Sequence, residues 1–383
     1  MNTFEESLLG VPLRRTYTLL PGIAAACLLA WLSIWLSSVV GRTLLGFEKS
    51  PVSPVMMAIL IGILLGNLLP VPAWLRPGLS FAVKKVLKLG IILIGVRLSI
   101  VEVLRMSGLG IPVVVVCILA ALLVTTLLNR RLGLPERLGT LIAVGTSICG
   151  VSAIVATGPA IGAKEEEVTY AVTVITVFGI IATLVYPYLA RVLFAADPVK
   201  AGLFLGTAVH DTSQVTGAAL LYADVFSQPR ALDIAAVIKM VRNAFMVAVI
   251  PLMALVYRRR SEKDAKKEPR GNGAALRKLL PLFVVGFLVV ALLRTTGDIG
   301  INSGAKAFGL WDGTAWKTLC SFVKSWSVNL LVVALAGVGL STRFDMIKGL
   351  GAKPLLVGFG AALLVGVVSF LAISVLAKFV AIR

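Results

Sequence analysis

Long apolar runs constrain the fold of this chain more than any other feature of the sequence. Its 383 residues are 58% hydrophobic and only 14% charged, far less charge than a soluble protein carries. Each run is near the roughly 20 residues that a transmembrane helix needs. The candidate spans are 17–39, 53–70, 81–100, 108–128, 138–160, 167–193, 201–222, 233–257, 279–296, 318–341 and 352–380. Because backbone groups in hydrocarbon must be bonded internally, these runs predict an all-α, polytopic membrane protein with about 11 transmembrane helices.

Positive charge is concentrated between the spans. The formal net charge is +19, and most of the basic residues fall on the side that holds the N-terminus, including the charged stretch 258–278. The positive-inside rule therefore predicts a cytoplasmic N-terminus and a C-terminus on the outer side. This placement indicates contact with the lipid bilayer, with no nucleic acid as a partner.

The chain is expected to form a single transmembrane domain over 1–383. An extra N-terminal helix in 1–50 precedes a first half, 51–195, and a second half, 200–383, which contains the cytoplasmic loop 258–278. Without the first span, five helices that start outside precede five that start inside. Such an inverted five-plus-five repeat is typical of secondary transporters.

Two pairs of segments echo each other within the chain. Residues 89–115 resemble 330–357, and "GTSICGVSAI" (145–154) resembles "GTAVHDTSQV" (206–215). The echoes do not fall at equivalent places in the five-plus-five plan, so they support it only weakly.

The two G-T segments also predict two broken helices. Their glycines favour a break in mid-membrane, and a break frees N–H groups at a new helix N-terminus, where anions bind. An alternative interpretation is that small and hydroxyl residues merely allow close helix packing. The predicted substrate ligands are Gly145, Thr146, Ser147, Gly150, Ser152, Gly206, Thr207, Thr212, Ser213, Gln214, Lys239, Arg242 and Asn243.

Three ionisable residues on two neighbouring spans favour a binding site over simple packing. A carboxylate such as that of Asp211 needs a partner or a watery cavity inside a membrane. Lys239 and Arg242 share a helix face at i and i+3, and Arg242 lies about 13 Å along its helix from Asp233. Lys239 is shallower, so snorkelling to the membrane surface is an alternative for it.

His210, the only histidine, is a candidate for ion or proton coupling together with Asp211. Its alternative role is a neutral imidazole bonded to a backbone carbonyl. The four cysteines are scattered singly, so neither a metal nor a cofactor is predicted.

The matching stretches "LKLGIILIGVRLS", "GTSICGVSAIVATGPAI", "GLFLGTAVHDTSQVTGAA", "VIKMVRNAFMV" and "LAGVGLSTRFDM" resemble the YeiH-like family of bacterial inner-membrane proteins, which are described as sulfate exporters. They span about residues 53–357, which is most of the chain. The resemblance implies a multi-pass transporter of the bacterial cytoplasmic membrane, related to cation–proton antiporters and anion transporters, with crossed, broken helices. It supplies no substrate residues.

The leading hypothesis is therefore a secondary transporter, and not an enzyme, that moves a small anion such as sulfate by alternating access. One alternative is a proton- or sodium-coupled exchanger of an organic acid that uses Asp211. Others are an intramembrane hydrolase built on Ser213, His210 and Asp211, and a passive channel. The sequence leaves a homo-oligomer open.

Overall fold

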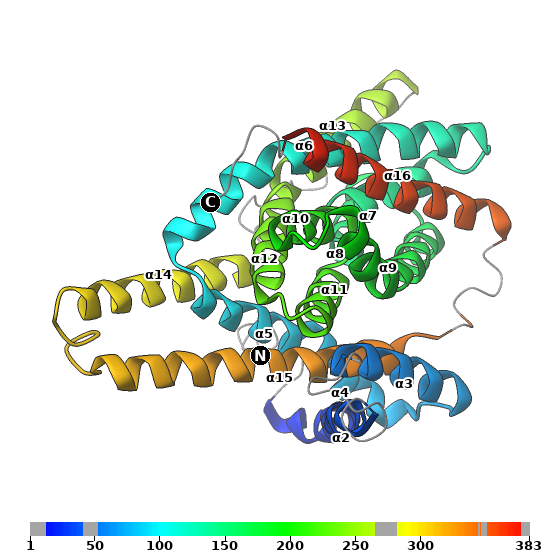
Figure 1. The fold of residues 1–383 in the computed structure, drawn as a ribbon. Helices are drawn as coiled ribbons and strands as arrows, with labels where there is room; N and C mark the ends of the chain where they lie inside the picture. Colours follow the sequence, from blue (N-terminus) through cyan, green and yellow to red (C-terminus); the bar gives the residue numbers. More distant parts are fainter. Residues whose placement is uncertain (1–12, 41–52, 265–281, 344, 346–350, 377–383) are drawn as a thin grey trace. The chain divides into compact units, whose positions relative to one another are not determined.

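The computed structural model describes residues 13–40, 53–264, 282–343, 345 and 351–376. Within these ranges the regular elements are helices, which confirms the all-α class (Figure 1). The α-helices are α2 (Leu20–Ser38), α3 (Pro54–Leu68), α4 (Arg76–Phe81), α5 (Leu87–Ile94), α6 (Ile100–Arg131), α7 (Glu136–Ser147), α8 (Val151–Ala160), α9 (Glu165–Leu193), α10 (Pro198–Ala208), α11 (Thr212–Val225), α12 (Pro229–Ala244), α13 (Met246–Asp264), α14 (Leu282–Asn302), α15 (Gly313–Ser341) and α16 (Ala352–Leu376). Short 3-10 or π turns are η1 (Leu13–Thr18), η3 (Ala73–Leu75), η4 (Ala82–Val86) and η5 (Gly95–Arg97).

The helices divide between two compact units. The first comprises residues 1–103, 220–233 and 283–345, and the second comprises 104–219, 234–282 and 346–383. The units are interleaved along the chain, because α6, α11 and α12 each begin in one unit and end in the other. The inverted repeat of 51–195 and 200–383 stays a prediction.

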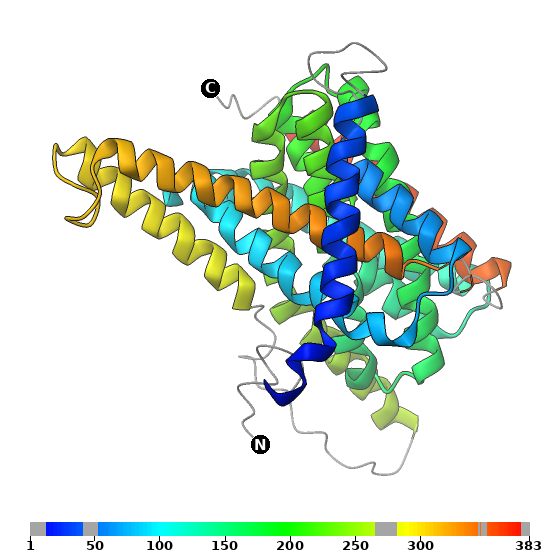
Figure 2. The ribbon, with the colours of Figure 1, turned by 90° about the horizontal axis from the view of Figure 1, so that it is seen from below.

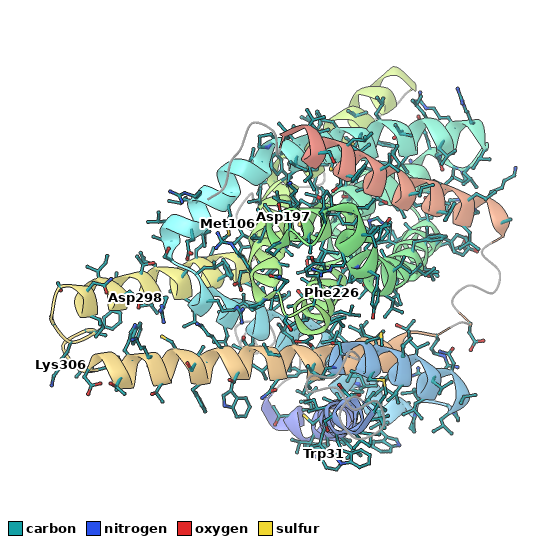
Figure 3. The ribbon with its side chains drawn as sticks, in the orientation of Figure 1. Trp31, Met106, Asp197, Phe226, Asp298 and Lys306 are labelled. Carbon is teal, nitrogen blue, oxygen red and sulfur yellow. The ribbon has the colours of Figure 1, made fainter. Side chains whose placement is uncertain are left out.

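In the first unit, α15 packs against α2, α3 and α5 (Figure 2). The approach to α3 is close, since a Cβ atom built on Gly62 would lie 2.9 Å from Cα of Gly339. Small residues permit this backbone contact, and such contacts drive helix association where lipid is the solvent. Figure 3 marks Lys306 in the turn that joins α14 to α15 and Asp298 on α14.

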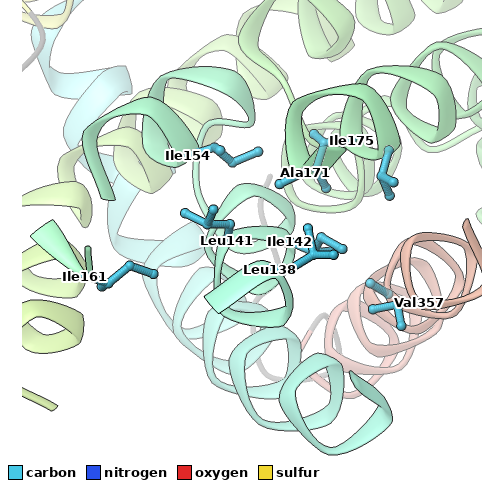
Figure 4. Close-up of a cluster of buried hydrophobic side chains, with 10 residues drawn as sticks. Leu138, Leu141, Ile142, Ile154, Ile161, Ala171, Ile175 and Val357 are labelled. Carbon is cyan, nitrogen blue, oxygen red and sulfur yellow. The ribbon is translucent and has the colours of Figure 1, made fainter. Parts of the chain in front are cut away.

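In the second unit, an apolar cluster holds α7, α8, α9 and α16 together (Figure 4). Leu141 and Ile142 of α7, Ile154 of α8 and Ile175 of α9 are almost fully buried. This cluster lies next to the break between α7 and α8, so it fixes both arms of the broken helix.

Seven helices among the described residues are long and apolar enough to cross a membrane: Thr16–Ser38, Gly110–Arg131, Glu165–Leu193, Pro229–Tyr257, Leu282–Asn302, Gly313–Ser341 and Ala352–Leu376. The other four predicted spans are short or interrupted. Span 53–70 forms the 15-residue α3, and span 81–100 is divided among α5 and short turns. Spans 138–160 and 201–222 are the two broken helices. A multi-pass helical membrane protein is thus supported, while the count of eleven stays a prediction.

One predicted boundary shifts in the structure. The helical backbone of α13 continues to Asp264, so residues 258–264 extend a helix where the sequence suggested the start of a loop. Arginine, lysine and glutamate have high helix propensities, and this segment is rich in them. The rest of the predicted loop, 265–278, lies outside the described residues.

Candidate functional site

The first predicted break is present between α7 and α8. Helix α7 ends at Ser147 and α8 begins at Val151, with Gly150 at the N-cap position. Gly150 has φ +71°, a conformation that costs little only for glycine. The other predicted glycine, Gly145, lies inside α7, where a Cβ atom would come within 2.7 Å of Ile154. Gly150 therefore makes the break, and Gly145 allows the packing beside it.

The second break, between α10 and α11, contains no glycine. The break consists of residues 209–211. It ends where the side chain of Asp211 caps the N-terminus of α11. Asp211 Oδ1 accepts hydrogen bonds from the backbone N–H of Ser213 at 2.9 Å and from its hydroxyl at 2.7 Å. In return, the amide oxygen of Gln214 accepts from the N–H of Asp211 at 3.0 Å. This reciprocal pair is a variant of the capping box, in which the N-cap side chain bonds the second N–H of the helix in place of the third.

The two breaks fall at the same place in the echoing segments. When "GTSICGVSAI" is aligned with "GTAVHDTSQV", residues 148–150 match 209–211, and the start of α8 matches the start of α11. The echo seen in the sequence therefore corresponds to one local structure that occurs twice.

Arg242 joins the C-terminal ends of α7 and α10. Its guanidinium donates to the carbonyls of Thr146 at 2.7 Å and Ser147 at 3.2 Å. On the α10 side it donates to Gly206 at 3.1 Å, Thr207 at 2.7 Å and Val209 at 2.8 Å. The last carbonyls of a helix have no intrahelical partner, so one side chain satisfies these groups on both broken helices.

Lys239 lies one turn away on α12 and also joins both breaks. Its ammonium donates to the carbonyl of Ile148 at 2.8 Å and to that of His210. Lys239 is 1% exposed and Arg242 0%, so the snorkelling alternative for Lys239 is wrong. Both cations act as helix caps.

The opposite, N-terminal ends of the half-helices meet at Asp211. A Cβ atom on Gly150 would lie 2.8 Å from Asp211 Oδ2, so this carboxylate borders the start of α8 while it caps α11. Asp211 is half-buried, whereas the side chain of Ser152, in the first turn of α8, is exposed. The N-terminal end of α8 is thus the accessible part of the site.

The His210 ring is buried between the breaks. Neither ring nitrogen has a hydrogen bond of normal geometry, although the backbone of Thr146 lies close enough to interact with the ring. His210 therefore lies beside the C-terminal end of α7, while its own carbonyl accepts a hydrogen bond from Lys239.

Three of the predicted hydroxyl ligands bond within their own helices. Thr146 donates to Ile142, Ser147 to Val144 and Thr207 to Leu203. Thr207 also contacts the hydroxyl of Ser369 on α16 at 2.6 Å. These three hydroxyls are therefore already bonded and buried, whereas the side chain of Ser152 is exposed.

Two further predicted residues bind neighbouring helices. Asn243 donates to the hydroxyl of Thr212 at 3.4 Å, and Gln214 donates to the carbonyl of Thr176 at 3.2 Å. Gly206 lets α10 approach α12, since its Cβ atom would lie 2.8 Å from Ile238. All the predicted site residues consequently lie on or beside the two broken helices.

Sequence reasoning missed three features of this region. Ser369 is one, because the contact of α16 with α10 has no local signal. Gly179 of α9 is another: a Cβ atom there would come within 1.9 Å of Gln214. The third, outside the site and in the first unit, is a partly buried ion pair between Arg97 and Asp233 near the start of α12.

The electrostatic balance of the site favours an anion. Each helix end carries about half an elementary charge, negative at the C-terminus and positive at the N-terminus. Lys239 and Arg242 face the two negative ends, and Asp211 faces the two positive ends. The helix contributions cancel, and two formal positive charges against one negative charge leave an excess of one positive charge.

Known proteins are similar in sequence to this chain over most of its length. The family model described as "Conserved hypothetical protein 698" matches residues 21–358. A UPF0324 membrane protein of Fusobacterium nucleatum is 33% identical over 304 residues, which cover 79% of this chain and 84% of the relative. One from Clostridium tetani is 30% identical over 357 residues, or 91% of this chain and 95% of the relative. One from Streptococcus pneumoniae is 34% identical over 339 residues, or 88% and 91%.

The range matched by the family model, 21–358, includes both broken helices and the cationic stretch of α12. The names of these relatives describe them as membrane proteins and give no substrate. The YeiH-like resemblance found in the sequence is consistent with the same grouping. The chain therefore belongs to the UPF0324 family of membrane proteins.

Proposed function

We propose that this protein is a secondary active transporter of a small anion, such as sulfate or a related oxyanion, in the bacterial cytoplasmic membrane. The observation that carries the proposal is the pair of helix breaks joined by Lys239 and Arg242. Interrupted helices at a substrate site are a common feature of secondary transporters. The excess positive charge at these breaks selects for an anion over a cation.

The cations act on the anion through their electric field, because their hydrogen bonds to the described residues go to backbone carbonyls. Direct ligands come from the N-terminal end of α8, where the first-turn N–H groups lack intrahelical acceptors. Ser152 adds an exposed hydroxyl there, and Thr212 and Ser213 start the matching helix. Such a helix N-terminus replaces part of the hydration shell of an oxyanion.

Transport by alternating access requires two bodies that move separately, and the chain supplies two compact units. The proposal includes the finer topology drawn from the sequence: eleven spans, an inverted five-plus-five repeat and a cytoplasmic N-terminus.

Flux in proteoliposomes tests the proposal. Purified protein is reconstituted, and uptake of radiolabelled sulfate and other oxyanions is measured against empty liposomes. We expect saturable uptake of at least one oxyanion, and a large loss of it in Ser152→Pro, which removes a first-turn N–H and the hydroxyl. Proline is tolerated in the first helical turn, so this variant should fold. Parent-like flux in Ser152→Pro would exclude the proposed anion site, and protein without any anion flux would exclude the function.

The position of Asp211 favours a second candidate function: a proton- or sodium-coupled exchanger of an organic acid. Its half-buried carboxylate lies at the meeting point of the two half-helices, where binding of a coupling ion would alter both. Flux that ignores imposed proton and sodium gradients would count against this candidate.

No observation favours the hydrolase. Ser213 donates its hydroxyl hydrogen bond to Asp211, and the nitrogens of His210 have no hydrogen bond to Ser213. A serine nucleophile needs an adjacent base that is oriented by a third group.

A further inference from the structure

A cavity of about 450 Å³ in the first compact unit lies apart from the proposed transport site. Its charged and polar lining residues are Arg76, Lys84, Arg343, Ser80 and Ser341, and its apolar wall includes Leu340. We infer that this cavity binds the headgroup of an anionic phospholipid from the cytoplasmic leaflet.

The cavity lies at one end of the helices that form it. The side-chain amide of Asn67, near the end of α3, donates to the carbonyl of Thr342, just past α15, at 2.9 Å. A Cβ atom on Gly66 would meet the carbonyl of Leu340 at 2.6 Å. Both helices therefore end at the same level, and the cavity opens where they leave the membrane.

This level is an interfacial one. Trp74, in the turn between α3 and α4, is 62% exposed, and tryptophan is enriched at the headgroup layer. The start of α2 is at the same level, because a Cβ atom on Gly22 would contact the carbonyl of Leu75. The charge distribution along the sequence places this side in the cytoplasm, where anionic lipids attract basic residues.

The charges of the cavity suit a phosphodiester. Arg76 and Lys84 are exposed, and neither takes part in an ion pair among the described residues. Arg343 pairs with Asp345 at 2.9 Å, and this partly offsets its charge. Two unpaired cations therefore remain for the single negative charge of a phosphodiester, with two serine hydroxyls as additional donors.

The apolar wall distinguishes a lipid from a soluble phosphate. Leu79 and Val83 line the cavity beside Leu340. Acyl chains can lie along this wall, whereas inorganic phosphate has no group that would benefit from it. A lipid headgroup with its chains uses both kinds of lining.

Native mass spectrometry of the purified full-length protein tests the inference. The probe is phosphatidylglycerol, titrated beside zwitterionic phosphatidylcholine. We expect the parent to bind phosphatidylglycerol preferentially, and the double variant Arg76→Gln/Lys84→Gln to bind it at least tenfold more weakly. The reason is that each basic residue near an anionic lipid contributes about 1 kcal/mol, or about fivefold.

The matched control removes two positive charges at the other end of the same unit. Lys306 and Lys317 are exposed at the turn before α15 and in its first turns (Figure 3), so Lys306→Gln/Lys317→Gln should bind phosphatidylglycerol like the parent. Lys84→Arg should also retain binding, which separates loss of charge from misfolding. Equal weakening in both double variants, or no preference over phosphatidylcholine, would overturn the site. Displacement by inorganic phosphate at equal concentration would assign the cavity to a soluble anion.

Discussion

The ammonium group of Lys239 donates to the main-chain carbonyl of His210, and the same group donates at 2.8 Å to the carbonyl of Ile148. These two carbonyls belong to different broken helices and occupy neighbouring positions of the repeated segment. One cation from α12 thus holds both interruptions at once. Arg242 repeats the arrangement one turn further along α12, with five carbonyls in place of two.

Replacing Arg242 by methionine should destabilise the protein strongly. The substitution introduces an unbranched apolar side chain that fills part of the same space, but it leaves five buried carbonyls without their donor. A single unsatisfied buried group costs about 1–3 kcal/mol, so we expect a loss of at least about 3 kcal/mol, measured as reversible unfolding or a lowered Tm in detergent. Arg130→Met is the control, because its ion pair with Glu136 is exposed and such pairs contribute at most about 1 kcal/mol. Equal melting of the two variants would contradict the capping role.

Gly150→Ala should abolish transport. The new Cβ atom would lie 2.8 Å from Asp211 Oδ2, at a residue with φ +71°, so it would push the carboxylate away from the start of α8. Gly133→Ala is the control for a positive φ, since Gly133 has φ +67° and nothing within 4 Å of the added atom. At Gly150 the backbone also lies outside the left-handed helical region, with ψ −124°, so Gly150→Ala combines backbone strain with the clash at Asp211. Flux measured in proteoliposomes at matched protein content distinguishes them, and equal flux would show that the contact between Gly150 and Asp211 is unimportant.

Asp211→Asn should separate the structural role of this residue from its charge. Asparagine is about as good an N-cap as aspartate, so we expect stability within about 1 kcal/mol of the parent. The formal excess at the site rises to two positive charges, so the anion should bind more tightly and leave more slowly. We therefore expect a lower Kd by calorimetry and a lower maximal flux, with any dependence on a proton or sodium gradient lost. A variant whose flux still follows the gradient would show that the coupling ion binds elsewhere.

The sequence placed the two breaks, because glycines and polar side chains in the middle of a span favour an interruption. The alternative that the sequence left open, close packing by small residues, also applies at Gly145 and Gly206. The sequence analysis was less accurate about which residues cause the breaks. Gly206 packs against α12, and the second break is set by Asp211 with Gln214. The D-x-x-Q spacing at 211–214 is a capping-box signal that could have been read from the sequence.

The role of the two cations could not have been read in the same way. Lys239 and Arg242 were expected to meet the anion directly, because charge and helical spacing are visible along one chain segment. Their carbonyl partners come from α7 and α10, about 30 to 100 residues away in the sequence. Which acceptors surround a buried donor depends on how three helices pack, and no local pattern encodes that. The same holds for Ser369, which reaches Thr207 from the far end of the chain.

The contact between Thr207 and Ser369 provides a measurable link between a broken helix and α16. Their hydroxyl oxygens are 2.6 Å apart and buried, but Thr207 also bonds to the carbonyl of Leu203. Hydrogen bonds between membrane helices average about 0.6 kcal/mol in double-mutant cycles. We expect Thr207→Val and Ser369→Ala to show a coupling energy of about that size in unfolding experiments. A cycle of Thr183→Val with Ser369→Ala is the control, because Thr183 bonds to Gly179 and Gln214 instead. Coupling that is absent from the first cycle, or equal in both, would show that α16 is held to α10 by apolar packing alone.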